Sequence, residues 1–188
     1  MVAKRQKRGG VPVDAPEVER LLRRLLTPIR HAYSFSLVVV AAADYAAGDV
    51  LSNSATDNVG APIHILNLAD EPGGQVTIMN ITMKCSEDAV LASLRLYFFS
   101  EAPLAAEVEM DDNVPFDLKT AEGRRKCVGD GILLNAFADR GTAAAMSSTD
   151  DIRRSFRCAP GRTDAWLVIT SEVAEANETA SMILEGEI

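Results

Sequence analysis

The chain has 188 residues, a net charge of −8, 47% hydrophobic residues and only 5% aromatic residues. This length fits one domain with an appendage, and its core is large enough to need no disulfide or metal. The three cysteines are widely spaced without a CxxC pair, which argues against a zinc site and predicts reduced thiols. No signal sequence is visible and the longest apolar run is too short to span a membrane, so we expect a protein made in the cytoplasm.

The first residues carry the opposite charge to the rest of the chain. Residues 1–31 have a net charge of +5, which leaves −13 on residues 32–188. The first fifteen residues combine Lys and Arg with Gly and Pro, a composition that predicts an extended arm that orders only on contact. We therefore divide the chain into a basic arm with an amphipathic helix at 1–31 and a β-sandwich body at 32–188.

A short helix is expected at 16–30. Asp14 can cap its start, Pro28 should end or kink it, and leucines recur at helical spacing between them. The arm and this helix supply the predicted partner-binding residues. These are Lys4, Arg5, Lys7, Arg8, Arg20, Leu21, Leu22, Arg23, Arg24, Leu25 and Leu26.

The body is predicted to be a set of short β-strands separated by turns. Strands are expected at 35–43, 61–68, 75–85, 91–100, 132–137, 156–158, 165–171 and 180–188. Residues 104–129 are expected to be loop-rich with a short helix near 119–126, and residues 139–154 to be a long connection. Because helical crossovers are missing, the pattern favours an antiparallel sandwich or barrel, and the fold class is mainly β.

Alternation assigns faces to two of these strands. In the strand at 91–100, Leu94, Leu96 and Phe98 share one face and should fill the core. In the strand at 75–85, one side is expected to hold four apolar residues. They are Met79, Ile81, Met83 and Cys85.

Three parts of the body, taken in order, carry a resemblance. They are Tyr45-Ala-Ala-Gly-Asp-Val-Leu51, then Leu94-Arg-Leu-Tyr-Phe-Phe-Ser-Glu-Ala-Pro103, then the closing strands Trp166-Leu-Val-Ile-Thr170 and Ala180-Ser-Met-Ile-Leu-Glu-Gly186. In this order they resemble a family of small structural proteins of tailed bacteriophages, some of which are capsid decoration (cement) proteins. The resemblance covers roughly residues 35–188 and implies a jelly-roll-like β-sandwich that stands as a homotrimer on the outer head surface. The basic segment is not part of the family pattern.

The basic arm leaves several partners open. Phosphate contacts to nucleic acid are disfavoured, because the arm has no interleaved aromatic residues and the body is acidic. Docking to an acidic protein surface is the favoured interpretation, and a solvated, silent tail is the remaining one. The helix at 16–30 could lie on a membrane, but it is short, and packing against a partner protein is favoured.

Other polar clusters have plainer interpretations. Glu109, Asp111, Asp112, Asn113 and Asp117 are oxygen-rich, but their spacing does not match an EF-hand loop, so an acidic solvated loop is expected and no metal or cofactor is predicted. The two histidines, His31 and His64, have no nucleophile or base partner in the sequence, so structural roles are expected. The run Arg124–Lys126 is expected to be a surface patch or an intermolecular salt-bridge site.

The sequence thus predicts a non-catalytic virion protein that decorates and stabilises a bacteriophage capsid. Its partner would be the major capsid protein, and it would be a homotrimer located on the outer capsid surface. The alternative is a tail- or fibre-associated module that binds a receptor or carbohydrate. That alternative needs an exposed aromatic platform, which only Trp166, Tyr33, Tyr45 and Tyr97 could supply together with the phenylalanines.

Overall fold

The structure is a computed structural model, and it describes part of the chain. The described residues are 34–39, 45–52, 60–85, 93–134, 138–139, 145–149, 152–172 and 182–187. The predicted arm and helix of residues 1–31, with every predicted partner-binding residue, lie outside them. Among the described residues, no helix is long and apolar enough to cross a membrane.

The described residues form a mainly β structure with one short helix, which confirms the predicted fold class. The strands are β1 (Ser34–Val39), β2 (Val50–Leu51), β3 (Ile63–Ile65), β4 (Gln75–Ile78), β5 (Ile81–Cys85), β6 (Leu94–Phe99), β7 (Ile132–Leu134), β8 (Ala138–Asp139), β9 (Ala145–Thr149), β10 (Arg154–Arg157), β11 (Ala165–Ser171) and β12 (Met182–Glu187). The helix is α2 (Ala121–Lys126), where the sequence predicts a short helix. All strand pairs in this part of the chain are antiparallel.

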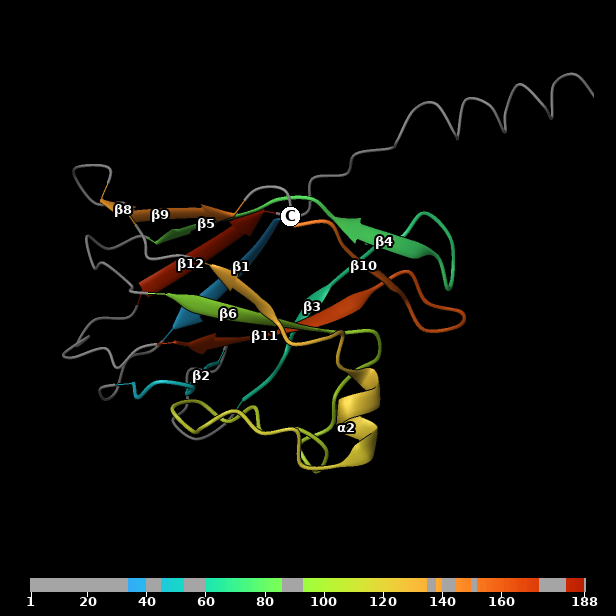
Figure 1. Ribbon diagram of the computed structural model, residues 1–188, viewed down its shortest axis with the longest axis horizontal. Helices are drawn as coiled ribbons and strands as arrows, with labels where there is room; N and C mark the ends of the chain where they lie inside the picture. Colours follow the sequence, from blue (N-terminus) through green and yellow to red (C-terminus); the bar gives the residue numbers. More distant parts are fainter. Residues whose placement is uncertain are drawn as a thin grey trace, which may run out of the picture. The chain divides into compact units, whose positions relative to one another are not determined.

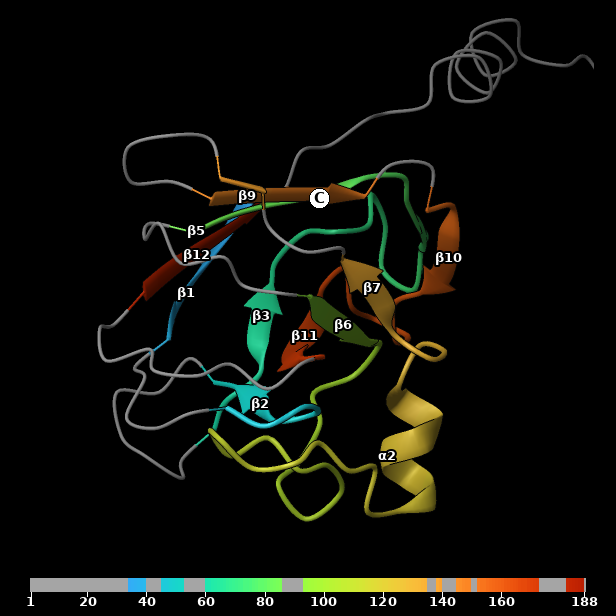
Figure 2. The same cartoon turned by 60° about the vertical axis from the view of Figure 1, so that its left-hand side comes forward.

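The strand pairs are nested in the sequence. β1 pairs with β12, β2 with β11, β4 with β10, β5 with β9, and β6 with β7, so the chain folds as one long hairpin. This hairpin is divided between two larger sheets, of order β1-β12-β5-β9-β8 and β2-β11-β6-β7, while β3 also pairs with β11 and β10-β4 forms a small third sheet. A long hairpin rolled over into two facing sheets is the strand order of a jelly roll. Figures 1 and 2 show the two larger sheets as separate layers.

The main hydrophobic core joins these sheets. It contains Ile81 and Met83 from β5, Leu96 from β6 and Leu167 from β11, and all four are fully buried. The predicted core face of Leu94, Leu96 and Phe98 is confirmed. Each strand places its alternate apolar residues on one face of its sheet. These residues become buried where the apolar faces of the two sheets pack against each other.

A second hydrophobic cluster lies on the other face of β6 and β11. It joins Phe99, Trp166 and Val168 to Val108 and Met110 from the long segment between β6 and α2. In Figures 1 and 2 this segment and α2 lie on the side of the β2-β11-β6-β7 sheet that faces away from the other sheet. Every residue of β11 is consequently buried.

Two predicted elements differ from the structure. The expected strand at 75–85 is two strands, β4 and β5. Every second residue is buried up to Ile78, but the next buried residue is Ile81, so the alternation is interrupted and Met79 between the strands is 44% exposed. The expected connection at 139–154 contains β9, whose small polar residues give no hydrophobic pattern. β9 is defined by its pairing with β5, a tertiary contact that overrides weak local preference.

Candidate functional site

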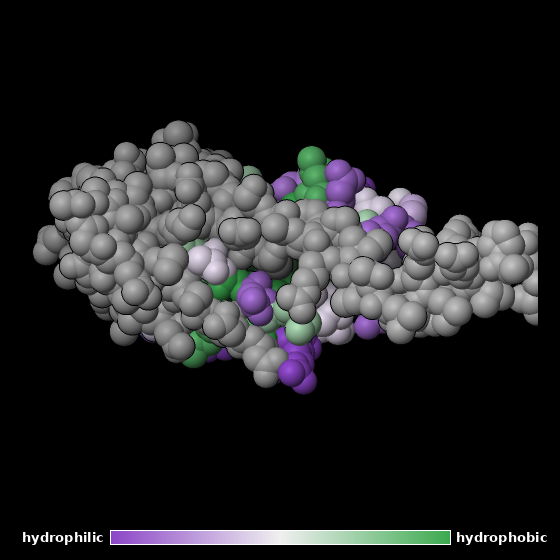
Figure 3. Space-filling view, turned by 90° about the horizontal axis from the view of Figure 1, so that it is seen from above, coloured by the Kyte–Doolittle hydropathy of each residue, from purple (hydrophilic) through white to green (hydrophobic). Residues whose placement is uncertain are grey.

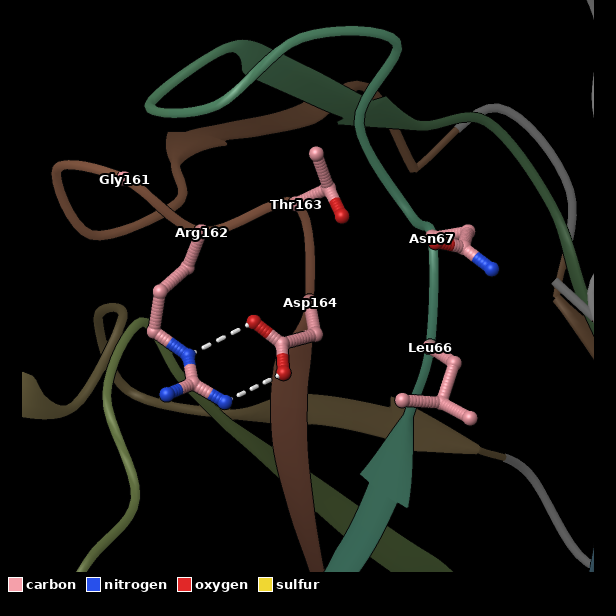
Figure 4. A pocket seen from close by; sticks show the side chains of 6 residues that line it. All are labelled: Leu66, Asn67, Gly161, Arg162, Thr163 and Asp164. Atoms are coloured by element: carbon pink, nitrogen blue, oxygen red, sulfur yellow. Dashed lines mark hydrogen bonds and ion pairs between the residues drawn. The ribbon is translucent and has the colours of Figure 1, made fainter.

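The candidate site lies where β3 and β11 separate. The two strands pair from Ile63 to Ile65, part at Leu66, and meet again where the backbone N–H of Ala69 donates to the carbonyl oxygen of Thr163 at 2.8 Å. The turn before β11 contains Gly161, whose φ of 80° is in the left-handed region that favours glycine. The separation leaves a hollow of about 240 Å³. Its lining residues are Leu66, Asn67, Gly161, Arg162, Thr163 and Asp164 (Figure 4).

Asp164 is the centre of a charged network at this hollow. Arg162 donates from Nε to Asp164 Oδ1 at 2.8 Å and from Nη2 to Oδ2 at 2.6 Å, and Figure 4 shows both bonds. His64 Nε2 lies 2.5 Å from the same Oδ2. The Arg162 guanidinium, with His64 as a second donor, holds the pKa of Asp164 well below its usual range. The Asp164 carboxylate therefore stays charged at neutral pH.

Trp166 forms the layer beneath these charges. The His64 ring stacks on its indole with ring centroids 4.8 Å apart, and the Arg162 guanidinium lies 4.7 Å from the indole centroid. Trp166 is 7% exposed, because these two side chains and the second hydrophobic cluster cover it. A second, larger hollow of about 390 Å³ adjoins this layer. Its lining residues are Glu101, Ala102, Ala159, Pro160, Arg162 and Trp166, so Arg162 lines both hollows.

Of the described aromatic residues that could have formed a platform, Tyr45 and Trp166 are buried and Tyr97 is half-buried. Tyr45 is 3% exposed, and its hydroxyl donates to the Asp112 carboxylate at 3.1 Å. Tyr97 stacks on Phe116 with centroids 4.1 Å apart, and Trp166 is covered as above. Tyr33 lies outside the described residues.

The acidic segment at 109–117 is structural. Asp112 is 3% exposed and accepts from the backbone N–H of Ser52 at 2.8 Å, so the expected solvated loop is wrong at this residue. Glu109 pairs with Lys119 at 2.7 Å, and this ammonium group lowers the pKa of the Glu109 carboxyl. Within the described ranges, no three His, Cys, Asp or Glu side chains are grouped to hold a metal ion.

The expected basic patch at Arg124–Lys126 is also used within the chain. Lys126 is 7% exposed and its Nζ donates to Glu107 Oε2 at 2.6 Å, so the expected surface position is wrong for this residue. Arg125 pairs with Glu122 and Glu101 at 2.6 and 2.9 Å. These bonds hold α2 to the segment between β6 and α2.

Sequence reasoning did not predict the cluster of Arg162, Asp164 and Trp166. Its one visible signal is an Arg and an Asp two residues apart, immediately before the apolar strand at 165–171. The contribution of His64 depends on the register of β3 against β11, which sets His64 opposite Trp166 and cannot be read from local sequence. A scan against protein-family models and a search of curated proteins find no match to this chain.

Proposed function

We propose that this chain is a non-catalytic virion structural protein that decorates and stabilises a bacteriophage capsid by binding the major capsid protein lattice. The observation that carries the proposal is the nested antiparallel pairing, from β1 with β12 inward to β6 with β7. This jelly-roll order occurs in viral capsid domains and in lectins. The fold alone does not decide function, so the choice between these classes depends on the residues.

The residues that carry the phage-protein resemblance have structural positions. Gly48 has a φ of 92° and its N–H donates to the carbonyl oxygen of Ser171 at 2.7 Å, while Asp49 Oδ2 accepts from the N–H of Ala46 at 2.6 Å. The first motif is thus a turn that ties β2 to the end of β11. The second motif supplies the core face of β6. Motifs of this kind maintain a rigid body, which is what a cementing protein contributes.

The lectin-like alternative is less well supported. Sugar recognition through stacking needs an aromatic face open to solvent. Among the described residues, Trp166 and Tyr45 are buried and Tyr97 is stacked on Phe116. A glycan array that returns a specific hit would reverse this preference.

In the proposed mechanism the protein acts by cohesion. A homotrimer on the outer capsid surface would bridge neighbouring capsid subunits, and the basic segment 1–31 of each copy would contact them. Three linked contacts bind far more tightly than one, because binding of the first raises the effective concentration of the others.

The experiment compares the full chain with a chain lacking residues 1–31 on shells assembled from the major capsid protein of the same genome. We expect the full chain to cosediment with the shells, and the truncated chain to stay folded and remain in the supernatant. Light scattering should give three times 20.2 kDa for the free protein. Absence of the full chain from the pelleted shells would refute the proposal, and equal occupancy by the truncated chain would refute the role of the arm.

A further inference from the structure

The larger hollow is lined by an arginine that leaves three of its five N–H donors unused among the described residues. A guanidinium has five N–H donors and two edges that can each grip a carboxylate. Arg162 uses its Nε–Nη2 edge on Asp164. Its Nη1 makes no hydrogen bond in the described part of the chain, and Figure 4 shows Nη1 on the side away from Asp164. The Arg162 side chain is 48% exposed, so the Nη1–Nη2 edge is open to a ligand.

This arginine is already held in place. Asp164 fixes the guanidinium from one edge, and the indole of Trp166 supports it from below at 4.7 Å. Asp164 is itself fixed by His64. A ligand that binds the open edge therefore does not have to order a long side chain. The entropy cost of such ordering is a main reason why exposed ion pairs are normally weak.

One part of the hollow's lining suits a short aliphatic stem, and the rest is polar. Ala102, Ala159 and Pro160 line it together with Trp166, and its volume is about 390 Å³. That volume is near the lower end for small-molecule pockets, and it suits one side chain of a partner protein better than an extended ligand. Where described residues come to the surface in Figure 3, apolar and polar side chains lie next to one another.

We propose that this hollow binds an acidic side chain of a partner protein, with its carboxylate on the Nη1–Nη2 edge of Arg162 and its methylene groups against Pro160. Trp and Arg are the residue types most enriched at interface hot spots. A nucleic-acid strand is disfavoured, because its row of phosphates would meet a chain with a net charge of −8, and Glu101 lines the hollow. Glu101 is held by Arg125 at 2.9 Å, which limits its repulsion of one carboxylate. The proposal does not require the partner to be a capsid.

The chain contains a single tryptophan, so any indole N–H signal comes from Trp166 and reports binding at this hollow. The full chain labelled with ¹⁵N is titrated with a blocked peptide Gly-Leu-Glu-Leu-Gly and with its Gln twin, while the Trp166 indole N–H signal is followed. We expect a saturable shift with the Glu peptide and at least about tenfold weaker binding of the Gln twin, because charge-assisted bonds are about twice as strong as neutral ones.

Three variants make the test specific. Arg162→Gln should lose the difference between the two peptides, and Arg162→Lys should lose most of it, because an ammonium group cannot form the planar fork. Arg157→Gln removes the same charge from an exposed arginine outside the hollow and should leave the difference intact. Glu101→Gln should tighten the Glu peptide several-fold.

Three results would overturn the proposal. They are equal affinity for the two peptides, a preference for Glu that persists in Arg162→Gln, and a dT12 oligonucleotide that saturates the Trp166 signal more tightly than the Glu peptide. Circular dichroism of each variant verifies that it is folded. If the full chain binds the Glu peptide but not the capsid shells, only the proposed function is rejected. If it binds the shells but not the peptide, only this site is rejected.

Discussion

The two faces of β11 are both buried, but they are covered in different ways. The inner face, with Leu167 and Ile169, meets side chains from the opposite sheet in an apolar core. The outer face, with Trp166 and Val168, is covered by the long segment between β6 and α2. That segment is held by a buried tyrosine–aspartate bond, ion pairs and a helix cap. The inner face thus depends on packing, and the outer face on a covering that polar bonds keep in position.

This difference predicts that the two faces fail in different ways. A cavity in the inner core should lower the stability of both sheets together, because the nested pairs share that core. A substitution that weakens the outer covering should loosen only the segment between β6 and α2, which lies outside the paired strands. Substitutions on each side can therefore separate global unfolding from local opening.

The largest effect is expected from Leu167→Ala. Leu167 is fully buried in the inner core, and its truncation should cost about 3 kcal/mol of unfolding free energy through lost burial and a cavity. Urea denaturation followed by Trp166 fluorescence measures this loss. The matched control is Leu133→Ala on β7, whose side chain is 46% exposed and whose truncation should cost below about 0.5 kcal/mol. Similar losses for the two variants would contradict an inner core at Leu167.

The second largest effect is expected from Gly123→Ala, and it is a loss of stability where this change in a helix normally gives a gain. In an exposed helix this change stabilises by up to about 1 kcal/mol. Here a methyl group on Gly123 would collide with the backbone carbonyl oxygen of Glu107, which cannot move as a side chain can. We expect a loss of about 2 kcal/mol as α2 is displaced from the loop. A gain in stability in urea denaturation would show that α2 does not pack on this loop.

The sequence predicted one of these two faces well. Alternation identified the inner positions Leu94, Leu96 and Phe98, because a period of two is imposed on a strand that lies between a core and another layer. It missed Phe99, which is fully buried on the outer face, because Val108 and Met110, which cover it, lie in an irregular segment that strand alternation does not describe. It also missed the phase shift after Ile78, where one apolar residue, Met79, is left exposed.

The candidate site was hidden for a related reason. Arg162 and Asp164 are close in sequence, but their role depends on His64 and Trp166 meeting across two strands. Lys126 and Asp112 were predicted to be solvated because charged residues usually are. Each is buried beside a partner, Glu107 or Tyr45, that only the fold brings near.

A smaller effect is expected from the cap of α2. The Thr120 hydroxyl accepts from the backbone N–H of Gly123 at 3.0 Å, and this bond satisfies a donor that the helix cannot. Thr120→Ala should cost about 1 kcal/mol, while Thr120→Ser should retain the bond and most of the stability. Because the cap holds only the outer covering, hydrogen exchange should rise first at the amides of α2. Equal exchange in both variants would show that the cap does not control the covering.

The smallest effect is expected from the charged network over Trp166, because solvent screens its half-exposed arginine, and acid should remove this contribution. The pKa of Asp164 is lowered in the folded state by Arg162 and His64. A lowered carboxyl pKa stabilises the fold above the unfolded value, about 4, and this contribution is lost as the pH falls through the folded value. The urea midpoint of the wild type should therefore fall between pH 6 and pH 3 more steeply than that of Asp164→Asn. The exposed control Glu71→Gln should follow the wild type, and parallel curves for Asp164→Asn and wild type would show that the network does not contribute to folding.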